Sequence, residues 1–564
     1  MNMTHMTTNG TRRTPGWFTF AEILAISVIF AICGAWGVPD VNEPCYVGKA
    51  VRFWNPAWAE GDFFLESANP HAAYYVTFGW LTLFISPVTF TWMMRGIGWA
   101  LLAWGWRRLS SAVVPRTGVA VLTAALLAYM TENCTLAGEW VIGGTESKVL
   151  AYAAIFLALG DALRGRWNRA WVLIGVAALF HVLVGGWAGV VLAGAWFFTA
   201  LLDRQRRAIG LENNVQYTSS ENGTCITSFR SMLPGLIVGG LVALPGVWLS
   251  LQLSAEMDAA TIATADYIAV YRRLPFHLYL HGMETDRILR FFWLVLAFGV
   301  MGGLLRMMRS ERTPAQALID RFVLGTLLLS LIGGFWSWYA LHFLEHRFAA
   351  GILKFYWFRL ADIFVPAGLA MRTTTLLCNS SVAGQLWWLG DRARQRTARI
   401  AKYTALAGIA GFAIWYVGSL GVERVRTWGS PPRAEAKMNS MEWIAACEWV
   451  RDSGKIPPGA RFLTPRENST FTWRTGHPQV GTRKDFPQDA GSIVEWYARM
   501  KEIHSPYPNL AWPNWYGSLS ERKPDDLRWL GRKYDAPYLI VETKTPLPLE
   551  CVYTNKKYAV YRLF

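Results

Sequence analysis

Gly37-Val38-Pro39-Asp40-Val41-Asn42-Glu43-Pro44-Cys45-Tyr46 follows directly on an apolar run from Phe18 to Trp36. A run of this length can cross a membrane as one helix. The loop behind it carries two carboxylates, Asp40 and Glu43, where that helix would leave the bilayer. Because charge beside lipid is costly, such groups usually face a water-filled cavity or a partner. The stretch therefore predicts a site at the membrane surface.

The whole chain has the composition of a membrane protein. Of its 564 residues, 53% are hydrophobic, and 30 are Trp. This is too apolar for one soluble domain and too long for one core. We expect a multi-span α-helical membrane protein of about eleven spans plus an interfacial helix, with a small C-terminal extracytoplasmic α/β domain. The expected spans are 18–36, 92–107, 117–131, 149–163, 170–183, 187–202, 232–252, 289–307, 320–341, 358–377 and 401–420.

The segment 72–90 is apolar, but Pro87 interrupts it. Counting it as a full span would place Arg107 and Arg108 on the opposite side from the other basic clusters. We therefore predict a helix that lies in or dips into the membrane interface.

The formal net charge of +16 does not indicate a nucleic-acid partner. The cations sit in short loops between spans, which is what the positive-inside bias produces. This assignment makes residues 1–17 a cytoplasmic N-terminal tail. An odd number of spans then places the C-terminal domain outside the cytoplasm.

Four regions follow from this topology. The tail 1–17 precedes a transmembrane domain over 18–420, whose first outer loop is 37–73. A linker over 421–440 contains Gly429-Ser430-Pro431-Pro432. Residues 441–564 alternate helical and strand patterns, which predicts a small soluble α/β domain. That domain has no phosphate loop or zinc spacing, so we expect catalysis to lie elsewhere.

The cysteines leave the disulfide question open. Cys45 and Cys134 fall in outer loops, and Cys447 and Cys551 fall in the soluble domain. An oxidising compartment permits a Cys45–Cys134 and a Cys447–Cys551 bridge, and four unpaired thiols fit the sequence equally well.

Several short stretches carry a family resemblance. Asn42-Glu43 stands in the first outer loop, with Asp40 two residues before it. The soluble domain contains Pro458-Gly459-Ala460-Arg461-Phe462-Leu463-Thr464-Pro465, and later Lys484-Asp485-Phe486-Pro487-Gln488-Asp489 with Glu495-Trp496. The span pattern with its acidic first outer loop resembles the GT-C superfamily of integral-membrane glycosyltransferases, and it is similar in outline to protein mannosyltransferases and aminoarabinose transferases. The two runs in the soluble domain resemble those of an uncharacterised bacterial membrane family of the GT-C type.

The resemblance implies a multi-pass protein of the bacterial inner (cytoplasmic) membrane. Its partners would be membrane lipid and a polyprenyl-phosphate sugar donor, and the acceptor would be a lipid, a glycan or a protein. Members of the superfamily carry an acidic residue or an Asp-Glu pair where this chain has Asn42-Glu43. The Asn leaves open which carboxylate acts and whether a divalent cation, Mg or Mn, takes part.

Transfer from such a donor requires a general base and cations for the leaving phosphate. We expect Glu43 as the base first and Asp40 second, with helix capping as the alternative role for both. For the phosphate we expect Arg347, Lys354 and Arg359, where the alternative is an aromatic belt with snorkelling cations. Arg272 and Arg273 in the longest outer loop are the other candidates.

The remaining candidates for binding substrate are Asp62, His71, Glu146, Lys148 and His181. Asp62 follows Gly61 and could equally be a turn or cap residue. Glu146 and Lys148 open a predicted helix, and His181 could instead pack against a neighbouring helix.

Two other classes of function fit the sequence. A secondary transporter or flippase would also have many spans, although it usually has charges deep within them. A non-catalytic membrane assembly protein would use its soluble domain to bind a partner.

Overall fold

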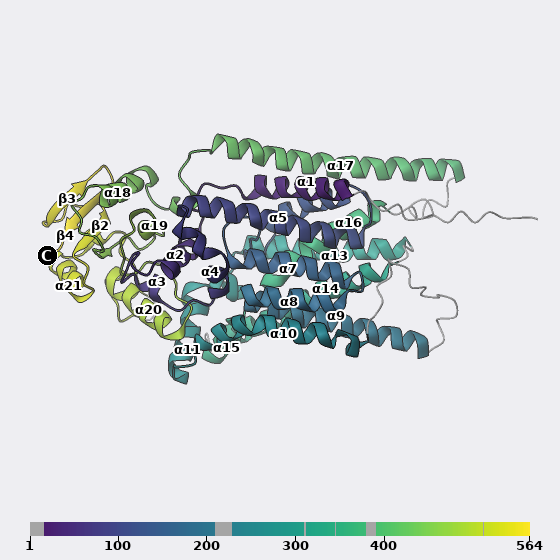
Figure 1. The fold of residues 1–564 in the computed structure, drawn as a ribbon, viewed down its shortest axis with the longest axis horizontal. Coiled ribbons are helices and arrows are strands. Elements are labelled where there is room, and N and C mark those ends of the chain that lie inside the picture. The colour runs from purple at the N-terminus through teal and green to yellow at the C-terminus, as the bar shows by residue number, and fades with distance from the viewer. Residues whose placement is uncertain (1–15, 209–227, 309–311, 344–345, 379–390, 511–512) are drawn as a thin grey trace, which may run out of the picture.

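The computed structural model describes residues 16–208, 228–308, 312–343, 346–378, 391–510 and 513–564. Most of the expected N-terminal tail lies outside this set. A long bundle of helices occupies one end of the molecule, and a small sheet domain occupies the other (Figure 1). The expected multi-span helical architecture with a C-terminal α/β domain is therefore confirmed.

Each of the eleven expected spans falls on one helix within the described residues. Seven of these helices are long and apolar enough to cross a membrane: α1, α9, α10, α13, α14, α16 and α17. The other four are shorter or more polar. The bounds are α1 Gly16–Gly34, α5 Pro87–Val113, α6 Val119–Asn133, α7 Ser147–Ala162, α8 Trp167–Phe180, α9 Val182–Ala208, α10 Phe229–Gln252, α13 Thr285–Met307, α14 Pro314–His342, α16 Arg359–Cys378 and α17 Asp391–Arg426.

The segment 72–90 is not a span, but Pro87 acts differently from what the sequence suggests. The short helix α4 (Ala72–Phe78) and a 3-10 turn (Gly79–Leu83) are followed by the start of α5 at Pro87. The Ser86 hydroxyl caps α5 by accepting from the Thr89 amide. Proline suits the first turn of a helix, because no hydrogen bond needs its missing N–H there. Pro87 therefore begins the next helix instead of interrupting an interfacial one.

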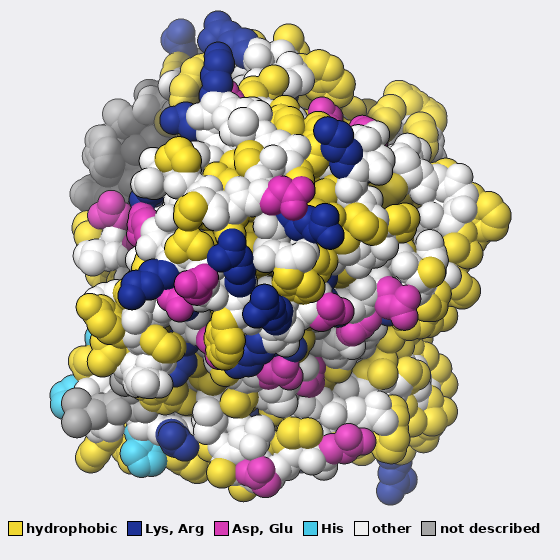
Figure 2. All heavy atoms as spheres, turned by 90° about the vertical axis from the view of Figure 1, so that its left-hand side faces the viewer, with side chains coloured by type: hydrophobic (Ala, Val, Ile, Leu, Met, Phe, Trp, Pro, Cys, Tyr) yellow, Lys and Arg dark blue, Asp and Glu magenta, His cyan; other side chains and the backbone are white. Residues whose placement is uncertain are grey.

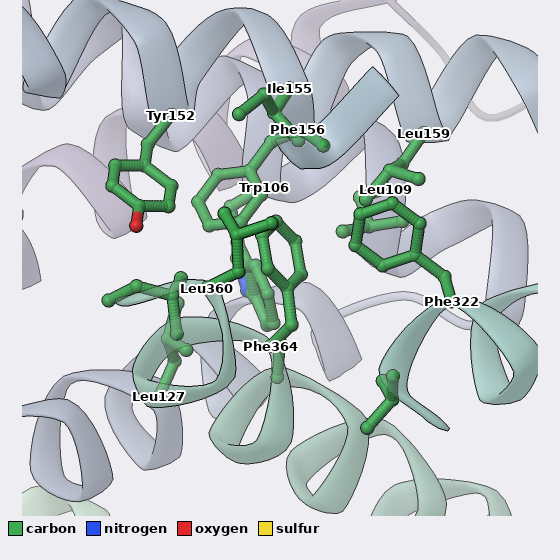
Figure 3. Packing of buried hydrophobic residues seen from close by; sticks show 14 of the residues in the cluster. Trp106, Leu109, Leu127, Tyr152, Ile155, Phe156, Leu159, Phe322, Leu360 and Phe364 are labelled. Atoms are coloured by element: carbon green, nitrogen blue, oxygen red, sulfur yellow. The ribbon is translucent and has the colours of Figure 1, made fainter. Parts of the chain in front are cut away.

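Aromatic side chains from four helices fill the middle of the bundle (Figure 3). Trp106 of α5 meets Phe156 of α7 at 5.5 Å between ring centroids, and Phe156 meets Phe364 of α16 at 5.8 Å. Phe322 of α14 completes the group at 4.8 Å from Phe364. At Gly105 the backbone of α7 is so close that an added Cβ would lie 2.8 Å from a carbonyl oxygen. Small residues allow this kind of approach between membrane helices.

The basic clusters between helices lie at the end of the bundle away from the sheet domain. There they pair with acidic residues, as Arg107 does with Glu22 at 3.1 Å and Arg372 with Asp320 at 2.8 Å. At the opposite end, Arg424 of α17 donates to the Cys33 carbonyl of α1 at 3.1 Å. The end of α1 is thus fixed beside the linker that leads into the tail. Which end faces the cytoplasm stays a prediction.

The tail is a four-stranded sheet with helices on both faces. The strand order is β1-β2-β4-β3, with β1 parallel to β2 and the other pairs antiparallel. Alternate residues of β2 face opposite sides, so Leu539 packs in one core and Ile540 in the other. The bounds are α18 Ser440–Asp452, β1 Phe462–Leu463, α19 Phe471–Thr475, α20 Ala490–His504, α21 Pro524–Lys533, β2 Tyr538–Glu542, β3 Glu550–Thr554 and β4 Tyr558–Arg562.

Short elements fill the space between the bundle and the tail. They are α2 Glu43–Trp54, α3 Phe63–Glu66, α11 Ala259–Tyr267, a π-helical turn Ile268–Arg273, α12 Pro275–Leu278, a 3-10 turn Leu280–Gly282, α15 Arg347–Leu353 and a 3-10 turn Arg433–Glu435. Cys45, Cys134, Cys447 and Cys551 all carry free thiols.

Viewed from the tail end, the surface mixes Lys and Arg with Asp and Glu, without one large basic patch (Figure 2).

Candidate active site

A cavity of about 790 Å³ lies where the helix bundle, the tail and the short elements between them meet. Charged side chains form much of its wall, and the cationic ones outnumber the acidic ones. The cationic residues are Lys49, Lys148, Arg273, Arg287, Arg290, Arg359, Arg433 and Lys484, and the acidic ones are Asp40, Glu132, Glu139, Glu146 and Glu284.

One face of α2 forms part of the wall. Asn42, Cys45, Tyr46 and Lys49 all line the cavity. Their spacing of three and four residues places them on one side of a helix. Pro44 in the first turn suits the start of that helix, and the Asn42 side chain donates to Glu146 at 3.1 Å.

Glu43 lies behind this wall. Its side chain is fully buried and accepts two hydrogen bonds from Arg95 of α5, at 2.7 and 2.8 Å. It also accepts from the Asp40 amide at 2.6 Å, while Arg95 donates to the Trp36 carbonyl at 2.5 Å. Burial raises the pKa of Glu43, and the charge of Arg95 opposes that shift. The pair thus ties the end of α1 and the first loop to α5.

Asp40, in contrast, faces the cavity. Its two oxygens accept from Arg433 at 2.9 and 2.7 Å, and Arg433 also lines the cavity. The Arg433 guanidinium lies 3.8 Å from the ring centre of Trp36. The linker after α17 therefore holds the expected carboxylate in place.

A second group joins four expected binding residues through Glu139. The Nζ of Lys148 lies 3.2 Å from Glu146 and 3.6 Å from Glu139. Arg359 pairs with the same Glu139 at 3.1 Å and reaches His181 Nε2 at 3.1 Å. This group balances two cations with two carboxylates.

His71 closes this side of the cavity. Its Nδ1 lies 3.1 Å from the Ser147 hydroxyl, and its Nε2 lies 3.4 Å from the Tyr46 hydroxyl. Burial lowers the pKa of His71 to about 4. The ring is therefore neutral at pH 7 and can exchange hydrogen bonds without adding charge.

Two cations of the cavity wall have no ion-pair partner among the described residues. Arg273, from the π-helical turn, is buried, and its Nε has no hydrogen-bond partner. Lys484, from the tail, is partly buried, and both residues line the cavity. Burial lowers the pKa of Arg273 to about 10, and burial with the nearby charge of Arg273 lowers that of Lys484. An anion bound between them would offset this cost.

Lys49 lies near this pair on α2. It donates to the Ser67 carbonyl at 2.8 Å and to the Ser67 hydroxyl at 3.1 Å. Burial lowers its pKa to about 8, so most of the ammonium is charged at pH 7.

Four expected binding residues, like Glu43, lie outside the cavity wall. Lys354 pairs with Asp266 at 2.8 Å, and the Arg272 guanidinium lies over the Tyr267 ring. Arg347 is exposed and reaches only the Thr264 hydroxyl, at 3.5 Å. Asp62 caps α3 by accepting from the Leu65 amide at 3.0 Å and joins the loop to the tail through Thr472. Their predicted roles in binding have no support from this geometry.

Sequence reasoning missed Lys49, Tyr46, Glu139, Arg433 and Lys484. The helical spacing of Asn42, Cys45, Tyr46 and Lys49 could have indicated the first two. Lys484 belongs to a stretch that carries the family resemblance, although the sequence predicts a tail without site residues. No local signal pointed to Arg433, whose partner lies 393 residues away.

The comparisons with known proteins agree with this architecture. A family model described as a domain of unknown function (DUF6798) matches residues 441–503, which is well under half the chain. That range contains Lys484. No curated protein matches the sequence.

Two solved structures are similar in fold. The crystal structure of ArnT from Cupriavidus metallidurans in the apo state has a TM-score of 0.47 and 14% identity, covering 97% of this chain and 98% of ArnT. The archaeal oligosaccharyltransferase AglB from Archaeoglobus fulgidus, in complex with an inhibitory peptide and a dolichol-phosphate, has a TM-score of 0.41 and 12% identity, covering 93% of this chain and 69% of AglB.

Proposed function

We propose that this chain is a membrane glycosyltransferase that moves a sugar from a polyprenyl-phosphate carrier to an acceptor outside the cytoplasm. The observation that carries the proposal is the pair of cations without ion-pair partners, Arg273 and Lys484, in the same cavity as the carboxylate of Asp40.

The cation pair supplies what a leaving phosphate needs. Arg presents a planar fork of donors and Lys a point charge, and both bind phosphate oxygens strongly. Since Arg273 is buried and Lys484 is partly buried, their interaction with an anion is stronger than at an open surface. Lys49 adds a third cation near them. The carrier's prenyl chain would remain in lipid while its phosphate enters the cavity.

Asp40 is the better candidate for the base, since it faces the cavity and Glu43 does not. In the proposed step, an acceptor hydroxyl gives its proton to Asp40 as its oxygen attacks the anomeric carbon. The bond between that carbon and the phosphate oxygen breaks, and polyprenyl phosphate leaves with the bonding electrons. A well-placed general base contributes roughly 10²–10⁴-fold to such a step. Arg433, which donates to both oxygens of Asp40, would hold that carboxylate in orientation.

The residues present do not fit a divalent-cation site. Within the described part of the chain, no group of three or more His, Cys, Asp or Glu side chains is arranged to hold a metal ion. Glu139 and Glu146 already pair with Arg359 and Lys148. Participation of Mg or Mn here stays a prediction, and no step is derived through it.

Lipid analysis tests the proposal whichever sugar the carrier bears. Cells lacking the chain should accumulate a polyprenyl-phosphate sugar, and the wild-type chain should remove it. Asp40→Asn and the double variant Arg273→Gln/Lys484→Gln should fail to remove it at equal protein abundance. Lys523→Gln, the same change at an exposed lysine of the tail, should behave as wild type. An unchanged lipid profile in cells lacking the chain would contradict the proposal.

The purified protein separates transfer from transport. In detergent there are no two compartments, so a flippase has no reaction to perform. Release of polyprenyl phosphate from the accumulated lipid, in the presence of a cell-envelope extract as acceptor, supports the enzyme. Intact donor after incubation with active wild-type protein would favour the transporter.

A further inference from the structure

Three buried polar atoms of residues that line the cavity have no hydrogen-bond partner among the described residues. They are Glu139 Oε1, Trp140 Nε1 and His181 Nδ1, and all three residues line the cavity. Glu139 is 5% exposed and His181 is 9% exposed. Because a buried polar group without a partner is costly, such groups usually have a ligand or water to bind.

Arg359 fixes two of these atoms. It pairs with Glu139 Oε2 and lies 3.1 Å from His181 Nε2. A guanidinium only donates, so Nε2 must accept and carries no proton. The proton of the neutral ring is then on Nδ1, which makes the unpartnered atom a donor. Glu139 Oε1 is an acceptor, and Trp140 Nε1 is a second donor.

This mixture of donors and an acceptor matches a sugar hydroxyl, which both donates and accepts. The charges around it decide which sugars fit. Glu139 and Glu146 are balanced by Arg359 and Lys148. Because these four charges already sum to zero, a sugar carboxylate or a sugar ammonium would add a buried charge that the group does not balance.

We propose that Glu139, Trp140 and His181 form a donor-sugar subsite that is selective for a neutral, hydroxyl-bearing ring over a uronic acid or an amino sugar. This inference rests on the proposed function. The proposal places the sugar near Arg359 and the carrier phosphate at Arg273 and Lys484.

Binding to purified full-length protein in detergent tests the subsite with four probes. They are bare polyprenyl phosphate and polyprenyl phosphates bearing a neutral hexose, a hexuronic acid or an aminodeoxyhexose. The neutral donor should bind about tenfold or more tightly than either charged donor, because it alone satisfies the three atoms without unbalancing charge. Tighter binding of either charged donor would overturn the subsite.

Two variants separate the subsite from the phosphate site. His181→Leu should lose about tenfold in affinity for the neutral donor and keep wild-type affinity for bare polyprenyl phosphate. Glu139→Gln, which keeps an acceptor oxygen but frees Arg359, should improve binding of the hexuronic donor relative to the neutral one. His342→Leu, at an exposed histidine outside the cavity, is the matched control.

The failures are distinguishable. If bare polyprenyl phosphate binds and Arg273→Gln/Lys484→Gln abolishes that binding, the phosphate assignment stands. Unchanged neutral-donor affinity in His181→Leu, or an unchanged preference for the neutral over the hexuronic donor in Glu139→Gln, would then overturn the sugar subsite alone. If none of the four lipids binds the wild-type protein, the proposed function and the subsite both fail.

Discussion

Removing Glu43 should destabilise the protein before it affects any chemistry. The side chains of Glu43 and Arg95 are both fully buried, and two short hydrogen bonds join them. Glu43→Ala leaves the guanidinium charged and unpaired in this site. Breaking a buried pair from one side costs about 3–5 kcal/mol, whereas replacing both partners by apolar residues is often neutral. We therefore expect Glu43→Ala to lower the unfolding midpoint sharply and Glu43→Leu/Arg95→Met to restore much of it.

Thermal unfolding of the purified protein in detergent, followed by intrinsic fluorescence, measures this difference. Glu60→Ala, at an exposed carboxylate of the same loop, is the control and should leave the midpoint unchanged. Transfer activity is then measured well below each midpoint. A Glu43→Ala protein as stable as wild type but inactive would refute the reasoning and restore Glu43 as the base.

Three further predictions follow from the cavity. Asp40→Asn should lower the transfer rate, measured by kinetics, by roughly 10²–10⁴-fold. Donor affinity, measured by equilibrium binding, should change little. An unchanged transfer rate would show that Asp40 is not the general base. Lys484→Gln should weaken carrier binding and make that binding less dependent on salt concentration, because one charge–charge contact is lost. If the variant and the wild type show the same salt dependence, the carrier phosphate does not bind at Lys484. Burial lowers the pKa of Lys49 to about 8, and a bound anion favours the protonated form of this lysine. Carrier affinity should therefore fall as the pH rises from 7 to 9, and it should fall less in Lys49→Met. An equal fall in the wild type and in Lys49→Met would contradict this prediction.

The positions of the spans could be predicted from sequence because they depend on local properties of each segment. Length and hydropathy decide whether a segment can cross a membrane, and each predicted span falls on a helix. The role of Pro87 was misjudged because proline both interrupts and begins helices. Only the Ser86 cap before it distinguishes the two cases.

The site was only partly readable because it depends on contacts between distant segments. Asp40, His71, Glu146 and Arg359, all predicted near the ends of spans, line one cavity. It could not show that Asp266 neutralises Lys354, although that lysine has aromatic neighbours typical of a phosphate site.

The contribution of the tail to the cavity could not be predicted from sequence, because it depends on how the tail packs against α2. Lys484 lies more than 400 residues from α2 in the chain, yet its neighbour Asp485 lies within 3.7 Å of the Cys45 sulfur. Burial of Glu43 was equally hidden, because a carboxylate after a span looks the same in sequence whether it faces water or an arginine.

The most direct test of the central claim is photoaffinity labelling with a polyprenyl phosphate that carries a diazirine on its first isoprene unit. If the carrier phosphate lies between Arg273 and Lys484, adducts should map to the peptides around these two residues. They should disappear in Arg273→Gln/Lys484→Gln and persist in Lys523→Gln. Adducts confined to other surfaces, or unchanged labelling in the double variant, would contradict the account.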